Sequence, residues 1–133
     1  EREMKPYCDL HHVALTPYSA LASGRLAKHP GEQSQRLKED TYAKGKYDQS
    51  YNQDLPIILR VEELAQKHHV SMSEIALSWL MTKVTAPIVG ATKCSHIDTA
   101  IRAVDFHLTP DECQYLEACY QPHHLVGVMA EKR

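Results

Sequence analysis

The sequence predicts an α/β fold built on parallel β-strands. Two short apolar runs, Val13–Thr16 and Ala86–Val89, are each followed by a turn of small residues. Helical patterns separate the two runs, and such an alternation of strands and helices is typical of parallel sheets. Because these sheets bind ligands at the carboxyl ends of their strands, the two turns are the candidate functional segments.

The first residues of the chain, up to about His12, are expected to form the end of a helix. The evidence for a helix is that the apolar residues of this segment share one helix face. Pro6 is unfavourable inside a helix, so a start near this proline is the alternative. The run Val13–Thr16 follows as the first strand. Its continuous apolar character is typical of a strand buried on both faces of a sheet.

The long polar segment over residues 22–54 has no sustained period and is predicted to be a loop. Loops of this length in compact domains are usually functional or disordered. Pro56 is then expected to begin a helix that runs to about His68, because proline suits the first turn of a helix. The residues expected on its buried face are Ile57, Val61, Leu64 and Ala65.

Three further helices are predicted from hydroxyl residues that precede an acidic residue by three positions, as in a capping box. These pairs are Ser71 with Glu74, Ser95 with Asp98, and Thr109 with Glu112. The last helix also has a proline at its first position and is expected to end near Tyr120. The expected inward-facing residues are Ile75, Ala76, Trp79 and Leu80 in the first of these helices and Ile97, Ala100, Ile101 and Val104 in the second.

Composition narrows the functional classes. The 133-residue chain has a net charge of −2, which gives no electrostatic reason to expect nucleic acid or an anionic membrane as a partner. No apolar run approaches the ~20 residues of a membrane span. The four cysteines form no CxxC pair and no secretory signal is recognised, so a cytoplasmic location is expected. Adjacent histidines diverge in helices and strands, so no metal site is predicted.

The turn after the first run resembles a motif of the aldo-keto reductases. The pattern Tyr18-Ser19-x-Leu21-x-x-Gly24-x-Leu26 is similar to the seventh-strand segment of that family, with Ala20 where proline is usual. Ile88–Thr92 resembles the eighth strand and its cofactor turn. Glu1–Met4 resembles the stretch before the sixth helix, and Leu116–His123 resembles the tail of one bacterial branch. In order, these motifs cover nearly the whole chain.

The resemblance implies that residues 1–133 are the C-terminal part of a (β/α)8 TIM barrel, with two parallel strands and four to five helices. Length agrees with this interpretation, because an isolated pair of parallel strands is a poor independent fold and a complete barrel needs ~250 residues. We therefore expect one domain that represents the last two βα units of a larger barrel.

The resemblance also implies a cofactor, NADP, with NAD as the alternative. Tyr18 would stack on the nicotinamide. Taken alone, this tyrosine is better interpreted as a packed aromatic residue that caps the barrel core, and the neighbouring Ser19 and Leu21 favour the cofactor role. The residues implied to contact the pyrophosphate and ribose are Ser19, Leu21, Ser23, Gly24 and Arg25. Those implied around the adenosine 2′-phosphate are Gly90, Thr92, Lys93 and His96. Arg25 and Lys93 are otherwise solvated loop residues.

Three residues of the second turn depart from the usual family pattern, namely His96, Thr99 and Ala100. The family commonly has Arg or Gln, Glu and Asn at these positions, and the last two contact adenine. The sequence therefore leaves the adenine contacts and the choice between NADP and NAD open.

The function implied is hydride transfer from NAD(P)H to a small-molecule aldehyde or ketone. The family's catalytic Asp, Tyr, Lys and His lie on early strands, before the matching region, so no catalytic residue is assigned and the chain alone is expected to be inactive. The alternative is a non-catalytic nucleotide-sensing subunit of the same fold, such as those of potassium channels. Exposed strand edges and apolar helix faces of a partial barrel favour a homo-oligomer.

Overall fold

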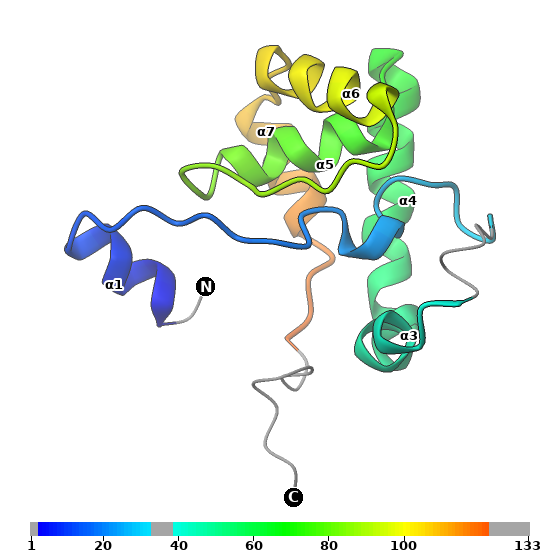
Figure 1. The fold of residues 1–133 in the computed structure, drawn as a ribbon, viewed down its shortest axis with the longest axis horizontal. Coiled ribbons are helices and arrows are strands. Elements are labelled where there is room, and N and C mark those ends of the chain that lie inside the picture. Colours follow the sequence, from blue (N-terminus) through cyan, green and yellow to red (C-terminus); the bar gives the residue numbers. More distant parts are fainter. Residues whose placement is uncertain (1–2, 33–38, 123–133) are drawn as a thin grey trace, which may run out of the picture.

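The computed structural model describes residues 3–32 and 39–122, which form an assembly of helices joined by extended segments (Figure 1). Glu1 and the end of the C-terminal motif at His123 lie outside the described residues. The elements in chain order are α1 (Met4–Leu10), the 3-10 turn η1 (Ala22–Gly24), α3 (Thr41–Tyr47), the 3-10 turn η2 (Asp48–Ser50), α4 (Tyr51–His68), α5 (Met72–Met81), α6 (Cys94–Asp105) and α7 (Pro110–Glu117).

The hydrophobic core lies where α4, α5 and α7 meet. Apolar side chains spaced by three or four residues along α4 form one buried face, as helical periodicity requires. Fully burying such a side chain contributes roughly 1.5–3 kcal/mol, so this cluster is the main source of stability in the described chain. Its buried members are Ile58, Val61, Leu64 and Ala65 of α4, Met72 and Ile75 of α5, and Leu116 of α7.

Two of the three predicted helix starts are confirmed. The Ser71 hydroxyl accepts from the Glu74 N–H at 3.3 Å, and the Glu74 carboxylate accepts from the Ser71 N–H at 2.8 Å. Thr109 and Glu112 make the same reciprocal pair at 3.2 and 3.0 Å. Each box satisfies two N–H groups that a helix start otherwise leaves without a partner.

The third predicted start is wrong, because α6 begins before Ser95. Its N-cap is Lys93, whose side chain makes no capping hydrogen bond. The apolar stripe of α6 is also not directed into the core. Ile97, Ile101 and Val104 are exposed within the described chain, whereas the small residue Ala103 is fully buried. A small residue allows a helix to approach its neighbour closely, and α6 packs against α5.

Two predictions about the middle of the chain need correction. Residues 22–54 are not one loop, because η1, α3 and η2 lie within them and Asp40 caps α3 by accepting from the Ala43 N–H at 2.8 Å. The helix expected from Pro56 begins instead at Tyr51, so the proline lies inside it. Ile58 rather than Ile57 is the buried isoleucine of its first turns.

Neither predicted strand is formed as a regular strand in the described part of the chain, but the two apolar runs lie side by side (Figure 1). The Ala86 N–H donates to the Leu15 carbonyl at 3.2 Å, and the Ile88 N–H donates to the Pro17 carbonyl at 2.8 Å. Donor and acceptor both advance by two residues, which is the register of a parallel pair. Val13 is exposed, so the burial expected for both faces of the first run is also absent from the described chain, and Ile88 of the second run is exposed as well.

Pro17 explains why this pairing does not become a β-ladder. In a parallel ladder of this register the return hydrogen bond runs from the N–H of residue 17 to the Ala86 carbonyl, and proline has no N–H. The Leu15 N–H donates instead to the Thr85 hydroxyl at 3.1 Å. Almost all hydrogen bonds between the two runs are therefore donated by the second run and accepted by carbonyls of the first.

Candidate functional site

The two candidate turns leave the same end of the paired runs. The hydrogen bond from the Ile88 N–H to the Pro17 carbonyl lies directly before both turns. Tyr18 follows Pro17, and Gly90 comes two residues after Ile88. The structure thus brings together the beginnings of two segments that are about seventy positions apart in the sequence.

The first turn, residues 18–25, is tightly wound. Ser19, Ala22 and Ser23 have φ values of 59°, 48° and 57°, and Gly24 has a φ of 95°. Left-handed backbone costs a non-glycine residue roughly 1–2 kcal/mol, whereas glycine adopts it freely. The turn is closed by the Ala22 N–H to the Ser19 carbonyl and the Gly24 N–H to the Leu21 carbonyl, both at 2.9 Å. Strained backbone of this kind is often found at ligand-binding segments.

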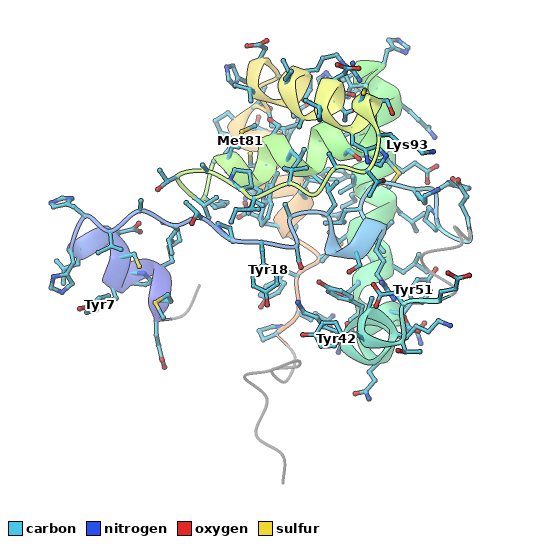
Figure 2. All side chains as sticks on the ribbon, viewed as in Figure 1. Tyr7, Tyr18, Tyr42, Tyr51, Met81 and Lys93 are labelled. Carbon is cyan, nitrogen blue, oxygen red and sulfur yellow. The ribbon has the colours of Figure 1, made fainter. Side chains whose placement is uncertain are left out.

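Tyr18 projects from the start of this turn and does not enter the described core (Figure 2). Tyr18 as a residue is 66% exposed. The ring is therefore available to another group. The ammonium of Lys46 approaches it from α3, with Nζ 5.7 Å from the ring centroid.

Arg25 closes the turn and is largely buried, with a side chain that is 13% exposed. Its Nη2 donates to the Asp48 carboxylate at 2.5 Å, and its guanidinium lies 4.8 Å from the centroid of the Tyr47 ring. Its Nη1 is buried and has no hydrogen-bond partner among the described residues. A buried donor without an acceptor is costly, so an anionic oxygen that reached this nitrogen after a shift of the side chain would be stabilised.

Arg25 lines a cleft of about 460 Å³ between the first turn and the start of α4. The neighbouring Lys28 is paired with Glu32 at 3.1 Å, as Arg25 is paired with Asp48. The cleft therefore contains cations that are mostly compensated by neighbouring carboxylates. The other residues that line it are Gly24, His29, Pro30, Gly31, Lys44, Tyr51 and Ile58.

The second turn leads into the N-terminus of α6. The Thr92 N–H donates to His96 Nδ1 at 3.3 Å, and the His96 N–H donates to the Lys93 carbonyl at 3.0 Å. Gly90, Thr92, Lys93 and His96 are all exposed, and Lys93 lies beside the start of α6 (Figure 2). The first turn of α6 contains no acidic residue and its N-cap side chain makes no hydrogen bond. A 12-residue helix that starts in this way favours an anion at its N-terminus.

Sequence reasoning missed the contribution of α3 and η2. Lys46, Tyr47 and Asp48 approach the first turn through the contacts with Tyr18 and Arg25. The sequence pattern that could have indicated this contribution is the mixture of basic and aromatic residues in 44–51, which is also typical of a solvated loop. Only the fold brings these side chains to the turn.

Other kinds of site find little support in the described ranges. Within 3–32 and 39–122, no group of three or more His, Cys, Asp or Glu side chains is close enough to hold a metal ion. Cys8, Cys94, Cys113 and Cys119 are free thiols. Among the described helices, none combines the length and apolarity that a bilayer crossing requires.

Comparison with known proteins decides the family. The sequence model of the aldo/keto reductase family matches residues 1–121. The chain belongs to this family. It is 41% identical over 128 residues to an aldo-keto reductase of Fusarium vanettenii, covering 96% of this chain and 35% of that protein. An aldo-keto reductase of Metarhizium robertsii is 43% identical over 129 residues, with 96% and 35% covered. The versiconal hemiacetal acetate reductase of Aspergillus parasiticus is 41% identical over 129 residues, with 92% and 36% covered.

The aldo-keto reductases are oxidoreductases that adopt a TIM barrel, generally use NAD(P)H and act on small carbonyl compounds. This chain spans about a third of the length of the relatives named above. The comparisons show that the chain is a member of the family. The roles of individual residues in the two turns stay predictions.

Proposed function

We propose that this chain forms the dinucleotide-binding part of an NAD(P)H-dependent reductase that converts aldehydes or ketones to alcohols. The observation that carries the proposal is the pairing of Ile88 with Pro17 in a member of this family. Because of this pairing, both candidate turns begin at the same place, and a single extended ligand can contact both.

The charges of the two turns fit the phosphate groups of such a ligand. The Arg25 side chain, which lines the cleft, and the tight backbone of Ser19–Gly24 suit the pyrophosphate. Lys93 at the start of α6 suits a terminal phosphate, because an ammonium and a helix N-terminus both favour a dianion. On this basis NADP is the proposed cofactor rather than NAD, which lacks the 2′-phosphate.

The reduced nicotinamide, when bound, supplies the hydride. The chain's own contribution is to hold and orient it. Tyr18 offers an exposed flat ring on which an aromatic ring can stack, and such aromatic contacts contribute roughly 0.5–1.5 kcal/mol beyond burial. In this proposal the proton donor comes from the part of the barrel that the aldo-keto reductases carry before the matching region, and this chain provides no catalytic residue.

Binding of NADPH and NADH to the chain tests the proposal, measured by isothermal titration calorimetry. We expect NADPH to bind more tightly, and Lys93→Met to weaken NADPH about ten-fold while changing NADH little, because the lost contact is a charge-assisted one to the 2′-phosphate. Lys5→Met is the matched control, since it also removes one positive charge but lies in α1. Equal loss for both nucleotides would contradict the assignment of Lys93.

Catalysis is tested with a hybrid in which this chain replaces the matching segment of the Fusarium vanettenii relative. We expect the hybrid to oxidise NADPH in the presence of an aromatic aldehyde, with formation of the alcohol. A folded hybrid that binds NADPH and yields no alcohol would contradict the reductase proposal and favour a sensing role.

A further inference from the structure

Lys46, near the end of α3, reaches the ring that the proposed function gives to the nicotinamide. Its Nζ lies 5.7 Å from the centroid of Tyr18 and 5.0 Å from that of Tyr47. Both distances are within the range of a cation–π interaction. The side chain of Lys46 is half-buried, whereas that of Lys44 is exposed. Lys46 is thus placed between two aromatic rings.

The position of Lys46 is tied to the first turn. The next two residues along the chain are both bound by Arg25, through the ring of Tyr47 at 4.8 Å and the carboxylate of Asp48 at 2.5 Å. Arg25 itself closes the turn that begins with Tyr18. The Arg25–Asp48 ion pair and the contact of Arg25 with the Tyr47 ring therefore hold this end of α3 against the first turn, so that the ammonium of Lys46 lies beside Tyr18.

We propose that Lys46 is a specificity-determining residue that favours the reduced cofactor over the oxidised one. This inference rests on the proposed function, in which the nicotinamide stacks on Tyr18. The nicotinamide ring of NADP⁺ carries a positive charge, and the dihydronicotinamide ring of NADPH carries none. The phosphates and the adenosine are the same in both nucleotides, so a positive charge near Tyr18 distinguishes them by the nicotinamide alone.

The expected size of the effect follows from the geometry. Stacked aromatic rings have centroids about 4.5–7 Å apart, so the ammonium of Lys46, 5.7 Å from the Tyr18 ring, lies at most about 13 Å from the bound nicotinamide. Two positive charges at about 10 Å in a partly screened site weaken binding roughly three-fold. For a reductase this means that NADPH is retained and NADP⁺ is released more readily after the reaction.

The test measures dissociation constants of NADP⁺ and NADPH for the chain by isothermal titration calorimetry at low ionic strength. We expect Lys46→Met and Lys46→Gln to tighten NADP⁺ about three-fold relative to NADPH. Lys46→Arg, which keeps the charge, should retain the original ratio. Lys5→Met is the control for the loss of one positive charge elsewhere, and it should also retain the ratio. Added salt should shrink the difference between Lys46→Met and the unaltered chain, because screening weakens the repulsion.

The outcomes separate this inference from the proposed function. If the unaltered chain binds neither nucleotide, both proposals are overturned. If it binds both nucleotides and the two neutral variants leave their ratio unchanged, only the role of Lys46 is overturned. A shift of the same size in Lys46→Arg would also overturn it, because charge would then not be the cause.

Discussion

The helical core and the paired apolar runs of this chain are built in different ways. In the core, α4, α5 and α7 bury a continuous apolar cluster, and reciprocal capping boxes begin α5 and α7. The paired runs are joined by a one-sided set of hydrogen bonds, and the turns that follow contain left-handed residues and exposed side chains. Stability is thus concentrated in the helices, and the groups suited to a ligand lie where the structure is less constrained. The following changes test that contrast.

The largest expected effect comes from Ile75→Ala. Ile75 is fully buried in the core cluster, so its loss leaves a cavity and should lower the free energy of unfolding by about 3–4 kcal/mol. Leu59→Ala, on the exposed side of α4, should cost less than about 1 kcal/mol. Urea unfolding measures both. Similar losses at the two positions would show that the core does not carry the stability.

A smaller effect is expected where α4 meets α7. Glu112 accepts from Lys67 Nζ at 2.7 Å and contacts His68 Nε2 at 2.6 Å. The hydrogen bonds from Lys67 and from the backbone N–H of Thr109 lower the pKa of the Glu112 carboxyl to about 2. Because this pKa is below its ordinary value of 4.5, the carboxylate stabilises the fold above pH 4.5, and that contribution is lost as the pH falls towards 2.

Glu112→Gln should therefore lower the free energy of unfolding by about 2 kcal/mol at pH 7 and by progressively less below pH 4.5. Asp111→Asn, one residue earlier and exposed, is the control and should show a much smaller difference. Urea unfolding across this pH range measures both. A constant cost of Glu112→Gln from pH 7 to pH 3 would contradict the assigned ion pair.

A matched pair of serines tests the capping of the helices. Ser71→Ala removes the hydroxyl that accepts from the Glu74 N–H and should cost about 1 kcal/mol. Ser95→Ala should cost less than about 0.5 kcal/mol, because Ser95 is the second residue of α6 and does not cap it. Thermal unfolding compares the two variants. Equal costs would mean that Ser95 caps α6 after all.

The smallest expected effect is in the paired runs. Pro17→Ala supplies an N–H where the parallel register needs a donor to the Ala86 carbonyl. We expect hydrogen exchange at the Ile88 amide to slow about three-fold, with global stability changed by less than about 1 kcal/mol. Unchanged exchange at Ile88 would show that something other than the proline interrupts the ladder.

The sequence predicted the features that are determined locally. The capping boxes at Ser71 and Thr109 need only a hydroxyl and an acidic residue three positions apart, and both formed. The predicted strands did not form as regular strands, because Pro17 cannot donate at the register that tertiary pairing imposes. Which face of α6 is covered was also not predictable, because the packing of Ala103 depends on a neighbouring helix.

The candidate site was predictable only in part. The two turns stood out through small residues and a family resemblance, and the family is confirmed. The polar contacts of Lys46 and Asp48 with the first turn were not predictable, since they depend on how α3 and η2 fold back. Residues that belong to a local sequence pattern can be found from the sequence. Residues that reach the site only because a polar segment folds back onto it cannot.

The central claim is that both turns bind one dinucleotide. Hydrogen exchange of the chain, followed during titration with NADPH, tests it most directly. We predict that the amides of residues 18–26 and 90–96 become protected together, with the same dependence on nucleotide concentration. Protection of one turn alone, or of neither, would contradict the claim.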